Sequence, residues 1–265
     1  MNKNGFPKSS TVLLIAVLLI VSNHAFAKKN AKEYYQIKIY SLKNNDQVAR
    51  VDSFLRTAYL PAMHRLGIEK IGVFKPVAND TSSVKKIYLW IPFKSLKQFE
   101  KTTAQLEKDE PYLNEGRSFL QAAFNNAPFV RVESMLLHAF DKQPKYEIPN
   151  LKSTVTNKVY ELRSYESATD YLFAGKVRMF NDGGETALFK RLGFNAIFYA
   201  SVISGPQMPN LIYMTSFENM EQRNAHWKTF GSDPEWKTLS ALPEYKNTVS
   251  HADIILMHAT DYSDL

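Results

Sequence analysis

Residues Val159–Ser167 read VYELRSYES, and they decide the fold because a second copy of the same pattern occurs earlier in the chain. The earlier copy is YYQIKIYSL, at Tyr34–Leu42. Both stretches alternate apolar and polar side chains, which predicts a β-strand with one apolar face. The residues that coincide in an alignment of the two are Tyr35, Ile37 and Tyr40 with Tyr160, Leu162 and Tyr165.

The similarity between the two parts of the chain continues beyond these strands. Each later match keeps the same order, and the offset stays between 120 and 126 residues. The matched pairs are RLGIEKIGVF (65–74) with RLGFNAIFYA (191–200), KIYLWIPFKSLKQF (86–99) with LIYMTSFENMEQR (211–223), KDEPY (108–112) with SDPEW (232–236), and SMLLHAF (134–140) with IILMHAT (254–260). A nearly constant offset of this kind indicates an internal repeat.

Each repeat is predicted to contain the same series of elements: strand, helix, two strands, helices, strand. In the first repeat the expected ranges are 34–42, 46–66, 68–77, 85–93, 94–108, 110–123 and 129–140. This βαββααβ order is typical of a ferredoxin-like α+β domain, in which helices cover one face of an antiparallel sheet. Because the other sheet face would be bare, we expect the two tandem repeats to close their sheets into one intramolecular pseudo-dimeric barrel.

The N-terminal 27 residues have the layout of a secretory signal peptide. Lys3 and Lys8 precede an apolar run, and Ala25-Phe26-Ala27 forms the expected cleavage site. The run is too short to cross a bilayer, so we expect cleavage, an exported or periplasmic protein, and no membrane insertion afterwards. The expected organisation is a signal peptide at 1–27, a first domain at 28–140, a polar linker at 141–156 and a second domain at 157–265.

The composition excludes several classes of partner and site. The chain has no cysteine, which excludes disulfides and thiolate metal sites. Loss of two lysines with the signal peptide lowers the formal net charge from +7 to +5, and the basic residues are scattered. We therefore expect no nucleic-acid partner. No HExxH or HxH spacing supports zinc, so no metal site is predicted.

The second repeat resembles the NIPSNAP family in VYELRSYE (159–166), LGFNAIFYASVISGPQMPNLIYMTSF (192–217) and MEQRNAHWKTFGSDPEWKTL (220–239). The resemblance covers about Asn157–Thr260, whereas the first repeat keeps the layout and has Lys38 where the second has Arg163. It implies a dimeric α+β barrel fold and no established reaction. Better understood barrels of this group bind haem or oxidise aromatic molecules between sheet and helices, but those activities do not carry over to any matched residue here.

The polar faces of the two first strands provide the leading candidates for ligand binding. These candidates are Lys38, Tyr40, Glu161, Arg163 and Tyr165. Because the apolar face is expected to pack on the helices, the polar face should point into the barrel or its mouth. There, Glu161 and Arg163 can neutralise each other, or Arg163 can hold an anionic ligand. The alternative is a wet edge, at which the polar face lies in bulk solvent.

Aromatic residues and histidines on other strands complete the candidate set. Tyr88, Trp90 and Tyr213 are expected on strands beside the polar face. His138 and His258 occupy matching places on the two closing strands, and such a histidine is either a core residue or a ligand of a bound group. If haem is the cofactor, these two imidazoles are the expected ligands.

Three further stretches are interpreted as structural. Asp233 before Pro234 predicts a helix N-cap rather than a catalytic acid, with Glu235 in the first helical turn. Residues 182–184 read DGG and predict a helix break. The helical stripe interpreted as core packing with a peripheral arginine consists of Arg223, His226, Trp227 and Phe230.

Three functions remain open. The first is a binding module for a small apolar or aromatic molecule in the barrel, because no catalytic constellation is recognisable. The second is an oxygenase-like enzyme, haem-dependent or cofactor-free, by analogy of fold; a cavity lined by His138 or His258 would favour it. The third is a structural scaffold that forms homo-oligomers, which a barrel filled with side chains would favour.

Overall fold

The computed structural model describes residues 1–2 and 31–265, so the apolar run and cleavage site of the predicted signal peptide lie outside the described residues. Within 31–265, eight strands form a closed barrel. Every neighbouring pair is antiparallel. The order around the barrel is β1 (Tyr34–Leu42), β3 (Lys85–Phe93), β2 (Gly72–Pro76), β8 (His251–Ala259), β5 (Val159–Glu166), β7 (Asn210–Phe217), β6 (Asn195–Ser204) and β4 (Arg131–Ala139).

The barrel consists of two four-stranded sheets, one from each half of the chain. The first half has the order β4-β1-β3-β2 and the second β8-β5-β7-β6. The sheets are joined edge to edge where β2 pairs with β8 and where β4 pairs with β6. The predicted α+β fold, with two ferredoxin-like halves closing one intramolecular barrel, is therefore confirmed.

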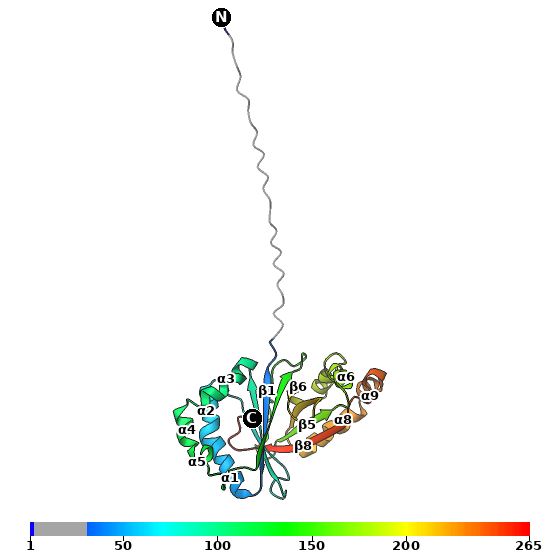
Figure 1. The fold of residues 1–265 in the computed structure, drawn as a ribbon. Coiled ribbons are helices and arrows are strands. Elements are labelled where there is room, and N and C mark those ends of the chain that lie inside the picture. The colour runs from blue at the N-terminus through cyan, green and yellow to red at the C-terminus, as the bar shows by residue number, and fades with distance from the viewer. Residues whose placement is uncertain (3–30) are drawn as a thin grey trace. The chain divides into compact units, whose positions relative to one another are not determined.

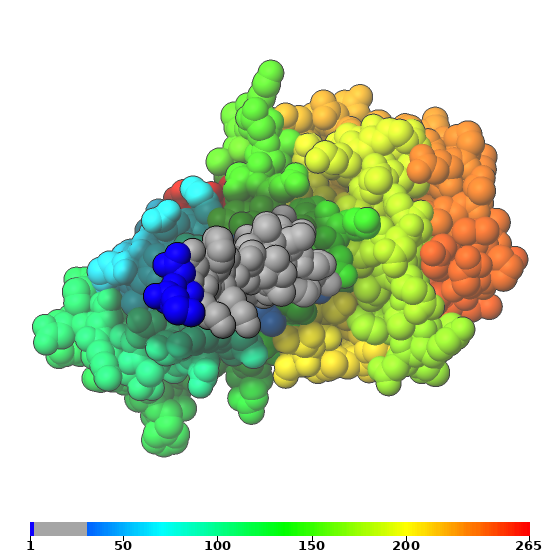
Figure 2. Space-filling view, turned by 90° about the horizontal axis from the view of Figure 1, so that it is seen from above, coloured from blue at the N-terminus to red at the C-terminus, as the bar shows by residue number. Residues whose placement is uncertain are grey.

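The helices of each half cover the outer face of that half's sheet, as Figures 1 and 2 show with the two sets on opposite sides. The first half contains α1 (Asn45–Phe54), a π-helical turn (Leu55–Tyr59), α2 (Leu60–Arg65), α3 (Leu96–Leu106), α4 (Glu110–Glu115) and α5 (Arg117–Leu120). The second contains α6 (Asp170–Asn181), α7 (Glu185–Arg191), α8 (Met220–Ser232), α9 (Pro234–Ala241) and a 3₁₀ turn (Pro243–Tyr245). None of the helices in the described part of the chain could cross a membrane.

The first helical segment contains a proline, Pro61, near its C-terminal end. The chain is helical from Asn45 to Arg65, but residues Leu55–Tyr59 form a π-helical turn directly before Pro61. Pro61 has no backbone N–H to donate to the preceding turn. The N–H of Leu60 bonds instead to the carbonyl of Leu55, five residues back. The backbone hydrogen bonds thus span five residues instead of four at this turn, and the helix continues beyond it.

Asp233 is the N-cap that its sequence predicted. Its side chain accepts hydrogen bonds from the backbone N–H groups of Glu235 and Trp236 at the start of α9. Asp109 caps α4 in the same way, and each of these aspartates pairs with the arginine of an RLG sequence: Arg65 with Asp109 at 2.6 Å and Arg191 with Asp233 at 2.8 Å. The two halves therefore share this helix start down to its side-chain contacts.

The interior of the barrel is filled by apolar side chains from both halves. Tyr35, Trp90 and Phe198 lie within 5.6 Å of one another, centroid to centroid, and Tyr160 packs on Phe74 at 4.8 Å. The interior core includes Ile37, Ile39, Leu137, Leu162, Ile212 and Met257 as well. A filled interior is normal for eight strands, because a barrel of that size has just enough width for side chains.

The prediction that the apolar faces of β1 and β5 pack on the helices is wrong. The apolar side chains of both strands point into the barrel, and the polar ones lie beneath the helices. The alternation along each strand was predicted correctly, but the assignment of its faces was inverted. The physical reason is that the barrel interior is the drier place: it is enclosed by two sheets, whereas the helix layer offers polar partners such as Arg223.

Candidate functional site

A fully buried carboxylate on β5 organises the polar side chains beneath the second helix layer. Glu161 has no exposed surface, and its oxygens accept four hydrogen bonds. Arg163 Nε donates to Oε1 at 2.6 Å, and Arg223 Nη2 does so at 2.8 Å. Arg223 Nε and Trp227 Nε1 donate to Oε2 at 2.9 and 2.7 Å. Burial by itself would raise the pKa of Glu161, but these hydrogen bonds and the charge of Arg163 hold it below its usual value.

Arg163 lies over an aromatic ring. Its guanidinium carbon lies 3.5 Å from the centroid of Trp227, a cation–π contact. Its Nη1 donates to the hydroxyl of Tyr165 at 2.9 Å, and that hydroxyl lies 2.9 Å from the hydroxyl of Tyr213. Burial opposes the charged form of Arg163, but its neighbours Tyr213, Tyr165 and Glu161 raise its pKa, so it stays cationic.

A second buried ion pair lies between α6 and α7. Lys176 Nζ and Glu185 Oε2 are 2.8 Å apart, and their side chains are 6% and 3% exposed. Burial raises the pKa of Glu185, and the positive charges of Lys176 and Arg163 reduce this effect. Aromatic rings surround the ammonium group: its Nζ lies 4.8 Å from the centroid of Phe180 and 5.7 Å from the centroids of Tyr165 and Trp236.

These groups border a cleft of about 450 Å³ between the second sheet and its helices. The lining combines aromatic rings with three ionic side chains. It consists of Arg163, Tyr165, Lys176, Glu185, Phe189, Trp227, Phe230, Gly231, Trp236, Val249 and Ala252. We call this space the second-half cleft.

Local structure explains how distant residues meet at this cleft. Alternation along β5 puts Glu161, Arg163 and Tyr165 on one face. Arg223 and Trp227 are four residues apart on α8, so both reach the same carboxylate. The predicted helix break is present: α6 ends at Asn181, and Gly184 has a left-handed φ of 90° that reverses the chain into α7. This reversal brings Glu185 back to Lys176.

Four of the predicted site residues gather at or beside the cleft. Glu161, Arg163, Tyr165 and Tyr213 are joined by the hydrogen bonds described above, although on the helix side of the sheet and not inside the barrel.

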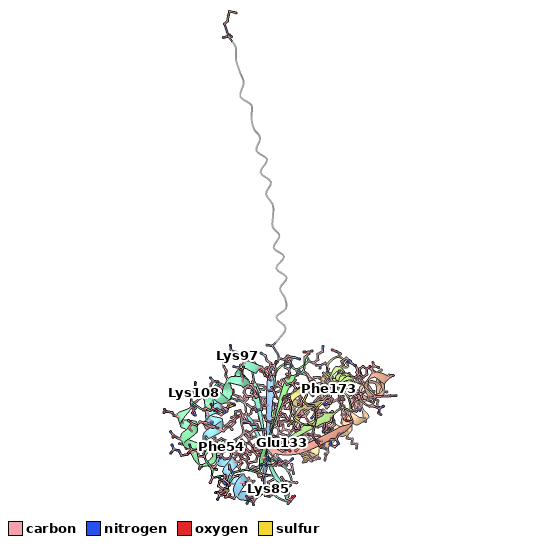
Figure 3. All side chains as sticks on the ribbon, viewed as in Figure 1. Phe54, Lys85, Lys97, Lys108, Glu133 and Phe173 are labelled. Carbon is pink, nitrogen blue, oxygen red and sulfur yellow. The ribbon has the colours of Figure 1, made fainter. Side chains whose placement is uncertain are left out.

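Their first-half counterparts behave differently. Tyr40 is buried in the helix-side core, and Lys38 lies over the ring of Tyr59 at 5.3 Å, where burial lowers its pKa. Rings such as Phe54, labelled among the helices of this half in Figure 3, pack this layer closely; Phe54 stacks on Phe119 at 4.0 Å.

The other four predicted residues lie away from the cleft. Tyr88 and Trp90 belong to the barrel interior. His138 stacks on Tyr34 at 4.5 Å, and His258 shares a hydrogen bond of 2.8 Å with the carbonyl of Lys158. Neither histidine lines the second-half cleft. Haem ligation by these two histidines therefore stays a prediction, without support from this cleft.

Several cleft residues were missed from the sequence, and two others were predicted correctly as core but not as cleft residues. Lys176, Glu185, Phe189 and Trp236 carried no signal, because nothing in their spacing shows that they meet. Trp227 and Phe230 belong to the helical stripe that was interpreted as core. That stripe contained the useful signal: an arginine and a tryptophan four residues apart are suitable partners for a buried carboxylate.

Three solved structures share this fold over most of the chain. A proposed monooxygenase from Lactobacillus acidophilus NCFM is 14% identical, with a TM-score of 0.53 over 86% of this chain and 94% of that chain. A proposed monooxygenase from Fusobacterium nucleatum subsp. nucleatum is 8% identical, with a TM-score of 0.55 over 86% and 93%. An anthrone oxidase-like protein is 9% identical, with a TM-score of 0.52 over 88% and 93%. Identities this low establish the fold alone.

The protein is therefore a dimeric α+β barrel of the pseudo-dimeric kind, with both halves on one chain. Residues 157–264 match the NIPSNAP family model, in agreement with the resemblance that the sequence of this half showed. No curated protein matches the chain.

Proposed function

We propose that this protein binds a small aromatic molecule carrying an acidic group, and that the binding site is the second-half cleft. The observation that carries the proposal is the combination of a space of about 450 Å³ with aromatic lining residues and an arginine whose side chain is only 11% exposed. Small-molecule sites typically measure about 300–1,000 Å³ and pair apolar walls with a few polar groups. The filled barrel interior moves the proposed site from the barrel, where the sequence predicted it, to the helix layer.

The charges at the cleft favour an anionic ligand. Arg163 uses two of its N–H donors on Glu161 and Tyr165, and a guanidinium has more than two to offer. Two cations line the cleft, and the one carboxylate that lines it has a raised pKa. The lining therefore has one more cation than carboxylates, although Arg163 and Lys176 also pair with Glu161 and Glu185. The partly exposed rings of Trp227 and Trp236 can contact a planar ligand, at about 0.5–1.5 kcal/mol per ring pair.

A cleft-filling variant tests this proposal. Gly231 lines the cleft, and a Cβ built on it meets no atom within 4 Å, so Gly231→Leu fills space without disturbing the core. The probe is 8-anilinonaphthalene-1-sulfonate, an aromatic anion whose fluorescence reports binding. We expect saturable binding to the wild type and at least about tenfold weaker binding to Gly231→Leu, which corresponds to about 1.4 kcal/mol.

Thr229→Leu is the matched control, because Thr229 is exposed on the same helix and does not line the cleft. It should bind the probe as the wild type does. Equal binding by Gly231→Leu and Thr229→Leu would refute the site. If only Gly231→Leu weakens binding, native mass spectrometry of the protein purified from its own host should identify a natural ligand. The wild type should retain this ligand, and Gly231→Leu should lose it.

Glu185 supports a second candidate function, cofactor-free oxygenation of the bound molecule. Its buried carboxylate lines the cleft and has a raised pKa, which suits a general base. It would accept a proton from the substrate and become neutral, while Lys176 and Arg163 stabilise the substrate anion; molecular oxygen would be the co-reactant. The names of the solved relatives supply this reaction class by analogy of fold alone.

Oxygen uptake separates this candidate from simple binding. With the ligand that mass spectrometry identifies, the wild type should consume oxygen, and Glu185→Gln should still bind but lose most of this activity. A wild type that binds the ligand and consumes no oxygen would leave the binding function and exclude the oxygenase.

The filled barrel is the feature that favours the third hypothesis, a structural scaffold. That role requires self-association, which light scattering on the purified protein measures. A monomer at micromolar concentration would exclude the scaffold, whereas a defined oligomer unable to bind any small molecule would favour it over the binding module.

A further inference from the structure

Three potential metal ligands meet at one mouth of the barrel, on the opposite face of the sheet from the second-half cleft. Glu166 is the last residue of β5 and pairs directly with His251, the first residue of β8. Asp253 follows His251 on the same face of β8, because alternate residues of a strand share a face. This is the inner face, since Leu162 of β5 and Met257 of β8 belong to the barrel core.

The three side chains are close enough to bind one ion. One ligand atom from each lies within 4.8 Å of the other two, and His251 Nε2 lies 3.2 Å from Asp253 Oδ1. Ligands bound tetrahedrally at about 2.1 Å lie about 3.4 Å apart, so small side-chain movements suffice. Backbone bonds hold the strand ends in place, because the carbonyl of Glu166 accepts from the N–H of Ser250 at 2.8 Å.

A second observation points to a missing partner. Glu166 Oε1 is buried from solvent and has no hydrogen-bond partner. A buried carboxylate oxygen without a hydrogen-bond partner is unfavourable. A bound metal ion is one explanation for such an oxygen. No lysine or arginine of the described residues forms an ion pair with Glu166 or Asp253.

The negative charges near this mouth of the barrel also favour a bound cation. Burial raises the pKa of Tyr88 to about 12, and the negative charges of Glu133 and Asp253 add to the effect. Glu133 lies on β4 on the same inner face as Met135. Carboxylates of both halves therefore act on the same end of the barrel interior.

We propose that Glu166, His251 and Asp253 form a site for a divalent cation, and that the cation is Zn²⁺. One imidazole and two carboxylates with an open fourth position are a donor set that zinc accepts. The imidazole disfavours magnesium and calcium, which prefer oxygen ligands. The sequence predicted no metal site because its ligands come from strands separated by some 85 residues and meet only across the β5–β8 ladder. The site does not depend on the proposed ligand cleft.

The experiment is a titration of untagged protein with ZnCl₂, followed by isothermal calorimetry. We expect one Zn²⁺ per chain. His251→Ala and Glu166→Gln should each weaken binding by at least about tenfold, because changing even an indirect partner of a zinc ligand costs about 10–100-fold in affinity. His258→Ala is the matched control, since His258 lies on the same strand on the opposite face, and it should bind as the wild type does.

Two outcomes would overturn the proposal. The first is a wild type that takes up no Zn²⁺ in the titration. The second is a His251→Ala variant with unchanged affinity, which would place the ion elsewhere. His251 has a side chain that is 58% exposed, so its replacement leaves the fold intact, and the circular dichroism of each variant verifies this. An equal response to MgCl₂ would likewise refute the argument from the donor set.

Discussion

Replacing Glu161 by glutamine is the sharpest test of the buried charges under α8. Glutamine keeps the shape but loses the negative charge, and it presents an NH₂ group where Arg223 or Trp227 now donates. Two arginines would be left beside a neutral side chain, with only 11% and 18% exposure for Arg163 and Arg223. Breaking a buried ion pair costs about 3–5 kcal/mol. For a domain of this length that lowers the melting temperature by about 6–20 °C.

The pH dependence of this loss has a definite sign. The pKa of Glu161 is lower in the folded state than in the unfolded chain. Its contribution to stability is therefore complete above the unfolded pKa of about 4.3, and it is lost as the pH falls through the folded pKa. The difference in unfolding free energy between the wild type and Glu161→Gln should be constant near neutral pH and should shrink in acid.

Chemical denaturation at several pH values measures both effects. Glu235→Gln is the control, because its carboxylate is 56% exposed in a surface pair with Arg191, and such pairs contribute about 0–1 kcal/mol. A Glu161→Gln variant within about 1 kcal/mol of the wild type at pH 7, or a difference that persists unchanged at pH 3, would contradict the role assigned to Glu161.

Three further predictions follow from the packing and the N-terminus. Gly183→Ala should destabilise the protein by about 1–3 kcal/mol in thermal melting, because its Cβ would lie 2.7 Å from the carbonyl oxygen of Met179. Gly231→Ala is the control in the same assay: its Cβ lies in open space, so the variant should be neutral or stabilising. A fragment spanning 28–150 should aggregate or self-associate in gel filtration, because its sheet loses the apolar face of the other half; a stable monomer would contradict this. N-terminal sequencing of the mature protein should begin at Lys28, and a retained Met1 would exclude a cleaved signal peptide.

The sequence alone determined the order of elements and most of the chain's local structure. The β3 range of 85–93, the helix break at 182–184 and the N-cap at Asp233 are all local patterns, set by side-chain alternation, glycine and capping groups. Such features depend on neighbours in sequence, so they were predicted without knowledge of the tertiary structure. Boundaries were less accurate: the strand expected at 68–77 is β2, residues Gly72–Pro76.

The site was predicted only in part, for a different reason. Glu161, Arg163 and Tyr165 were recognised because they are polar residues in an otherwise apolar strand. Lys176 and Glu185 were not, because two residues on separate helices form an ion pair only after the chain reverses between them. The first half shows the same limitation of sequence-based prediction. Lys38 and Tyr40 on β1 were predicted as ligand-binding residues, but β1 lies under helices whose aromatic rings fill the space above it.

Only the tertiary structure decided which face of each strand is internal. Alternation determines which residues share a face, but in a closed pseudo-dimeric barrel both faces are covered, one by helices and the other by the opposite sheet. Tyr35 and Tyr160 could therefore have packed on either side. They point inward into the apolar core of the barrel, whereas Arg223 and Trp227 of α8 supply hydrogen bonds to Glu161 on the other side.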